Sequence, residues 1–87
     1  MKRVVYRYDP LKLAGANLGI DPEASGEAFR AVLQRALEVE WPDASIEVVK
    51  GPPGCELEGF DDRSLAELRV EGLARGVRKA ASWIVYY

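Results

Sequence analysis

The feature that most constrains the fold of this chain is a helical stretch whose two ends are both marked by proline. Asp21 and Pro22 form the start signal, because an Asp side chain accepts hydrogen bonds from the free amides of a first turn and Pro fits the first helical position. The helix must end near Trp41, since Pro42 disfavours helical geometry in the residue before it. Between these ends runs one apolar stripe, which another element must cover: Phe29, Val32, Leu33, Ala36 and Leu37.

Three shorter stretches have the two-residue period of strands, at residues 2–8, 45–50 and 55–59. Pro53 and Gly54 suit the middle of a type II turn, so we expect the second and third strands to form a hairpin. Residues 11–20 have no sustained period and are expected to form a loop. The first stretch alternates between two faces, which hold Val4, Tyr6 and Tyr8 on one side and Arg3, Val5 and Arg7 on the other.

A second long helix is predicted from residue 64 to about Ser82. Ser64 and Glu67 fit a capping box, in which the two side chains satisfy free amides at a helix start. Gly72 and Gly76 favour close docking on the sheet or on another helix, and a dimer seam is the alternative. The predicted inner face consists of Leu65, Leu68, Gly72, Leu73, Gly76, Val77, Ala80 and Ile84.

The length of the chain, 87 residues, leaves room for one hydrophobic core. Two cores would each fall near the roughly 40-residue size below which staples or partners are needed, so we expect one domain over residues 1–87. The order of elements predicts an α+β fold, β-α-β-β-α. No apolar run approaches the roughly 18 residues of a spanning helix, and the N-terminus has no signal-peptide pattern. We therefore expect a cytoplasmic protein with no membrane partner.

The sequence contains few of the residues that catalysis and metal binding need. Histidine is absent and Cys55 is the single cysteine, so a Cys/His zinc site is excluded, and no nucleophile-base pair is visible. The glycines at 15 and 19 have the wrong spacing for a phosphate-binding loop. Glu47 and Lys50 are three apart and should point to opposite faces of a strand, unlike the acid-x-lysine pair of metal-dependent nucleases. We expect no enzymatic activity, no cofactor and no metal, and we predict that Cys55 is a half-buried strand residue.

Acidic residues are the main candidates for binding a partner. The net charge of -2 disfavours direct nucleic-acid binding. Four carboxylates lie within seven residues and create a local negative field: Glu56, Glu58, Asp61 and Asp62. Such a field suits a hard cation or a protein that normally grips DNA phosphates. The alternative is structural, with strand glutamates facing water and aspartates beside a helix start.

The order of elements and one local passage resemble the DinI-like family, small bacterial regulators of the SOS response that bind the RecA recombinase filament. The passage is WPDASIEVVK, residues 41–50, in which aromatic-Pro-Asp ends a helix and leads into a strand; a long final helix then closes on WIV, residues 83–85. The resemblance implies both helices on one face of a three-stranded sheet, no enzymatic activity, and a RecA-like recombinase as protein partner. It also implies a binding surface of acidic residues on the last helix, for which this chain offers Glu67 and Glu71, with Asp61 and Asp62 just upstream. The predicted partner-binding residues are these four together with Glu56 and Glu58 of the third strand.

Two other functions remain open. PGCELEGFDDRSLAEL, residues 53–68, is similar to the strand and helix entry of HicB-like antitoxins, which implies neutralisation of a small RNA-cleaving toxin. An RNA- or nucleotide-binding module would instead use the open sheet face, with Arg3, Arg7 and Lys50 beside Tyr6 and Tyr8. Strand alternation separates the arginines from the tyrosines and argues against that module.

The chain ends in WIVYY, residues 83–87, five bulky and uncharged side chains. We expect Trp83 to pack beneath the second helix, against Trp41 or the sheet, because a small core benefits from every large ring. A homodimer contact is the alternative. The residues concerned in either case are Trp83, Ile84, Tyr86 and Tyr87.

Overall fold

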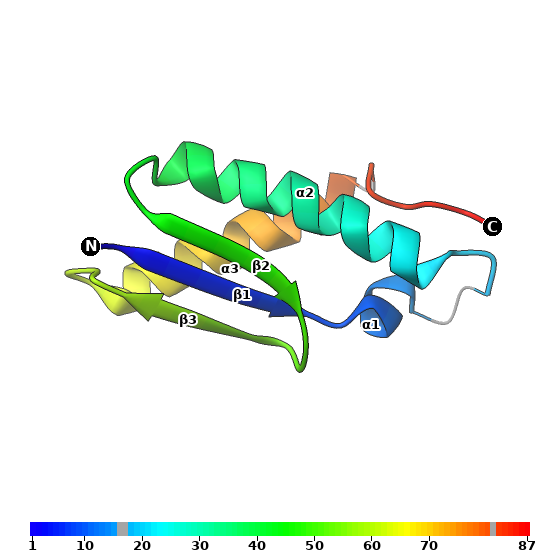
Figure 1. The fold of residues 1–87 in the computed structure, drawn as a ribbon, viewed down its shortest axis with the longest axis horizontal. Coiled ribbons are helices and arrows are strands. Elements are labelled where there is room, and N and C mark those ends of the chain that lie inside the picture. The colour runs from blue at the N-terminus through cyan, green and yellow to red at the C-terminus, as the bar shows by residue number, and fades with distance from the viewer. Residues whose placement is uncertain (16–17, 81) are drawn as a thin grey trace.

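The protein is an α+β domain in which two long helices cover one face of a three-stranded sheet (Figure 1). The computed structural model describes residues 1–15, 18–80 and 82–87. No helix within these ranges is both long and apolar enough to cross a membrane. The elements in chain order are β1 (Arg3–Tyr8), α1 (Pro10–Ala14), α2 (Pro22–Glu40), β2 (Ser45–Lys50), β3 (Gly54–Glu58) and α3 (Arg63–Ala80).

The sheet has the order β2-β1-β3, so the predicted hairpin between β2 and β3 is wrong. β1 lies in the centre, parallel to β2 and antiparallel to β3. The connection at residues 51–53 crosses the end of β1, where the Gly51 amide donates to the Tyr8 carbonyl at 3.0 Å. Gly54 is the first residue of β3 and has no positive φ, so it does not occupy the third position of a type II turn. The central place suits β1 because the side chains of Val4, Val5, Tyr6 and Tyr8 are all buried.

Two helices begin at an Asp-Pro pair, although only the second was predicted. Asp21 accepts from the amides of Glu23 and Ala24, and α2 ends at Glu40 with Trp41 as its C-cap, as the sequence predicts. α1 takes up the beginning of the stretch predicted as a loop, residues 11–20, and the Asp9 side chain accepts from the Leu11 amide at 3.0 Å. The predicted stripe of α2 is right at Phe29, Leu33 and Leu37 and wrong at Val32, which is 41% exposed.

α3 differs from its prediction in both its cap and its buried face. Asp62 accepts from the Leu65 amide at 3.1 Å, so Asp62 caps the helix and the proposed box of Ser64 and Glu67 does not. Leu65 and Leu68 are 63% and 69% exposed, and Cβ atoms added at Gly72 and Gly76 would meet open space. Small side chains let a helix approach a sheet closely, and the buried face consists of Ala66, Val70, Ala74 and Val77.

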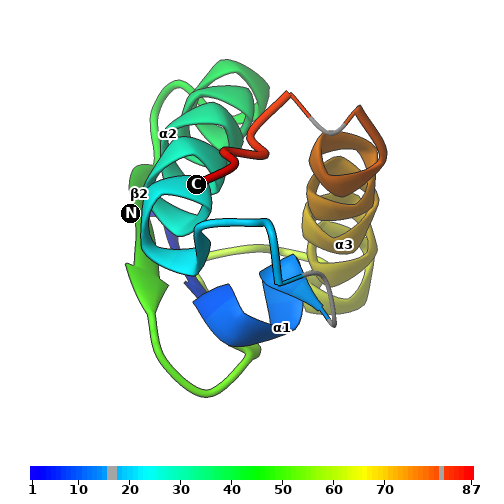
Figure 2. The ribbon, with the colours of Figure 1, turned by 90° about the vertical axis from the view of Figure 1, so that its right-hand side faces the viewer.

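The C-terminal segment turns back from α3 and lies beside the start of α2 (Figure 2). Trp83 is 5% exposed, and its ring meets Phe29 edge-on with centroids 5.8 Å apart. Trp41 instead packs against Phe60. Beyond Trp83 the segment is held by its backbone, since Asp21 N donates to Val85 O at 2.8 Å and Tyr87 N to Gly19 O at 3.0 Å. The side chain of Ile84 is half-buried, whereas those of Tyr86 and Tyr87 are exposed.

Candidate functional site

The open face of the sheet carries alternating basic and acidic side chains. Arg3 lies 3.6 Å from Glu58 and 3.9 Å from Glu47, which come from the two neighbouring strands. Arg7 lies 3.3 Å from Glu56. Glu56 and Glu58, two of the predicted partner-binding acids, are therefore paired with the arginines of β1. This pairing cancels much of the local field that the sequence predicted for them.

The tyrosines of β1 point to the opposite face, toward the helices. Tyr6 and Tyr8 are 8% and 4% exposed and belong to the hydrophobic core. Lys50 also leaves the open face and donates to Glu23 of α2 at 2.7 Å. The sheet therefore does not bring these groups together with the arginines as an RNA-binding surface requires. Glu47 and Lys50 point to opposite faces, as their three-residue spacing predicts.

The remaining predicted acids lie on or next to α3. Asp62 caps the helix, and Asp61 is exposed just before it. Glu67 and Glu71 are exposed and one helical turn apart. Neither forms an ion pair with any residue in the part of the chain that the structure describes. The six predicted acids thus fall into separate groups, and only the α3 pair keeps an unshared charge on a helix surface.

Cys55 lies on the helix-facing side of β3 and is half-buried, as predicted. Burial raises the pKa of its thiol to about 11, and the charges of Glu67 and Glu71 contribute to the rise. A thiol with this pKa is almost entirely protonated at neutral pH and is a poor nucleophile. Within the described ranges, no three acidic or cysteine side chains are grouped as a metal ion would need.

An exposed surface with both apolar and acidic character runs along the first half of α3. Leu65, Leu68 and Gly72 share one exposed side of the helix, and Glu71 follows Leu68 by one turn, with Glu67 one turn before Glu71. We call these five residues the α3 outer face. The helix then becomes basic, with Arg75, Arg78 and Lys79 in its last turns. The sequence indicated the glutamates as candidates for partner binding, but its helical pattern assigned both leucines to the core.

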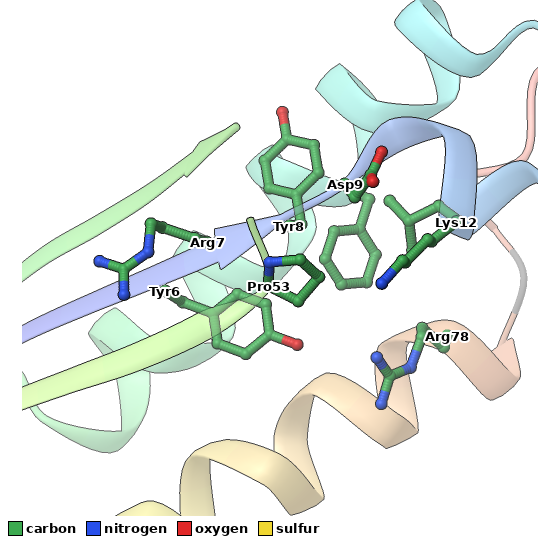
Figure 3. Close-up of a pocket in the computed structure, with 9 residues that line it drawn as sticks. Tyr6, Arg7, Tyr8, Asp9, Lys12, Pro53 and Arg78 are labelled. Carbon is green, nitrogen blue, oxygen red and sulfur yellow. The ribbon is translucent and has the colours of Figure 1, made fainter. Parts of the chain in front are cut away.

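A hollow of about 260 Å³ lies between β1, α1 and the basic end of α3 (Figure 3). Its polar lining includes Tyr6, Lys12 and Arg78. The sequence did not indicate this site, because residues 11–20, which include Lys12, were expected to form a loop. The one usable signal was Asp9-Pro10, which marks the start of α1.

No protein-family model matches this chain, and no curated protein or solved structure matches it significantly.

Proposed function

We propose that this chain is a non-enzymatic regulatory protein that binds a protein partner through the α3 outer face, with a RecA-like recombinase filament as the partner that the sequence resemblance implies. The arrangement of both long helices on one face of a three-stranded sheet is the arrangement expected for a DinI-like protein. It leaves the outward side of α3 available for contact.

The observation that carries the proposal is the combination of exposed leucines and unpaired glutamates on neighbouring sides of one helix. Leu65 and Leu68 are more than half exposed, and large apolar side chains gathered on one surface are typical of protein contacts. Glu71 follows Leu68 by one helical turn, and neither Glu67 nor Glu71 has an ion-pair partner among the described residues, whereas Glu56 and Glu58 are paired with arginines. A basic groove built to hold phosphates would attract this acidic pair, and the leucines would add apolar contact area.

The direct test is the binding of the purified protein to RecA filaments on single-stranded DNA, measured by surface plasmon resonance at low and moderate salt. We expect saturable binding that weakens with salt. The double variant Glu67→Gln/Glu71→Gln should weaken binding about tenfold or more, the loss expected when charge-assisted contacts are removed. Leu68→Ser should weaken binding as well, but it should leave the salt dependence of binding unchanged because it removes no charge.

A matched control removes two negative charges elsewhere, with Glu38→Gln and Asp43→Asn, both exposed and outside α3. This control should bind as the unmodified protein does. Equal losses in both double variants would mean that only the net charge matters and would contradict the assignment to α3. Unchanged RecA strand-exchange and co-protease rates at saturating protein would eliminate the recombinase as partner, and a copurifying small basic RNA-cleaving toxin would support the antitoxin hypothesis instead.

A further inference from the structure

The hollow at the end of β1 has apolar walls contributed by four different parts of the chain. Phe29 comes from α2, Leu13 from α1, and Pro53 from the connection that crosses β1. The rings of Tyr6 and Tyr8 complete the walls. Its volume of about 260 Å³ is just below the range of roughly 300–1,000 Å³ typical of small-molecule sites, so a ligand with a single ring is the appropriate size.

Three polar groups converge at the mouth of this hollow. Figure 3 shows the Lys12 ammonium directed from α1 and the Arg78 guanidinium from α3 toward the same side of the Tyr6 ring, where its hydroxyl lies. Burial raises the pKa of Tyr6, and the nearby Arg78 opposes part of this rise. The hydroxyl therefore stays protonated at neutral pH and is able to donate a hydrogen bond.

Both cations at the mouth lack an acidic partner. Neither Lys12 nor Arg78 forms an ion pair within residues 1–15, 18–80 and 82–87, whereas Arg3, Arg7 and Lys50 each do. The one carboxylate in the lining belongs to Asp9, and it accepts from the Leu11 amide at the start of α1. Lys12 and Arg78 are thus two unpaired cations at the hollow, and Asp9 is the one acidic group in its lining.

We propose that this hollow binds a small organic carboxylate with a single apolar ring, held at its carboxylate by Arg78 and Lys12 and along its ring by the aromatic walls. The planar guanidinium of Arg78 matches a carboxylate through two parallel hydrogen bonds, and Lys12 adds a second charge. Tyr6 supplies a further donor. The assignment is independent of the α3 outer face, because neither Glu67 nor Glu71 lines the hollow.

The test is a titration of the ¹⁵N-labelled protein with phenylacetate, followed by amide chemical shifts. We expect saturable shifts clustered at Tyr6, Lys12, Phe29 and Arg78. Phenylacetamide, which keeps the ring and loses the charge, and acetate, which keeps the charge and loses the ring, should each bind about tenfold or more weakly. Phenyl phosphate distinguishes a general anion site from a carboxylate site, and tighter binding of phenyl phosphate than of phenylacetate would overturn the carboxylate assignment.

Substitutions then locate the binding. Arg78→Gln and Lys12→Gln should each weaken phenylacetate binding about 10- to 100-fold, because each removes hydrogen bonds to a charged group. Arg35→Gln is the matched control, since Arg35 is an exposed arginine on α2 outside the hollow. All three side chains are exposed, so folding should be preserved, and the melting temperature of each variant verifies this. Absence of saturable shifts, equal binding of the neutral analogue, or equal losses in all three variants would overturn the proposal.

Discussion

The burial of Trp83 yields the most direct test of how the C-terminal segment stabilises the fold. Its side chain is 5% exposed, its ring meets Phe29 at 83° with centroids 5.8 Å apart, and its indole N–H donates to the Val77 carbonyl at 3.0 Å. We predict that Trp83→Ala lowers the free energy of unfolding by about 3–5 kcal/mol, through lost burial and the cavity left beside Phe29. A chain of 87 residues has in total about 4–13 kcal/mol, so the variant should be close to unfolding.

The measurement is urea denaturation followed by circular dichroism at several protein concentrations. Trp83→Phe loses the hydrogen bond but keeps an aromatic ring that fills most of the space. It should therefore lower the free energy of unfolding by less than Trp83→Ala does. Tyr87→Ala is the control within the same segment, because Tyr87 is 82% exposed, and it should change stability by less than about 0.5 kcal/mol. A loss below about 1 kcal/mol for Trp83→Ala, or one that disappears on dilution, would refute burial within the monomer.

Three further predictions concern two glycines and the cysteine. Gly59→Ala should destabilise the protein by at least about 1–2 kcal/mol in the same assay, because Gly59 has a φ of 77° and an added Cβ would overlap the Met1 carbonyl oxygen. Gly72→Ala should instead stabilise it by about 0.5–1 kcal/mol, since the added Cβ meets open space within a helix, and a loss of stability would mean that this face of α3 is packed. The folded-state pKa of Cys55 is raised from 9.0 to about 11, so its contribution to stability is complete below pH 9 and is lost as the pH rises toward 11. Urea titrations should therefore show that Cys55→Ala loses less stability over this interval than the unmodified protein, and equal slopes would contradict the burial of the thiol.

Local signals in the sequence predicted the elements well where a single mechanism determines them. Asp21-Pro22 and Pro42 set the ends of α2 through capping and sterics, and neither depends on tertiary contacts. The same mechanism acts at Asp9-Pro10, where it starts α1, but α1 has only five residues and too few apolar positions to show a period. Short helices of this kind are therefore found from their caps and not from periodicity.

Tertiary packing decided the features that local signals could not. Leu65 and Leu68 are more hydrophobic than Ala66 and Ala74, so a helical pattern read alone assigns the leucines to the core. The sheet and α2 accept the smaller side chains instead, and the leucines remain exposed. The hairpin prediction failed for a related reason. A short connection with Pro and Gly is compatible with a turn, but β1 buries side chains on both faces and takes the position between β2 and β3.

The hollow depends both on a local signal and on tertiary packing. Asp9-Pro10 starts α1, and the close approach of α1 to α2 then determines where the hollow lies. Gly26 of α2 is buried, and an added Cβ would lie 3.1 Å from a ring carbon of Tyr8 and 3.3 Å from Cβ of Pro10. The absence of a side chain at Gly26 therefore allows Pro10, and with it the start of α1, to lie against α2. Lys12 follows two residues later and reaches the mouth of the hollow from this position. A charge that belongs to an unremarkable loop in the sequence thus acquires a defined place opposite Arg78 through a glycine on a different helix.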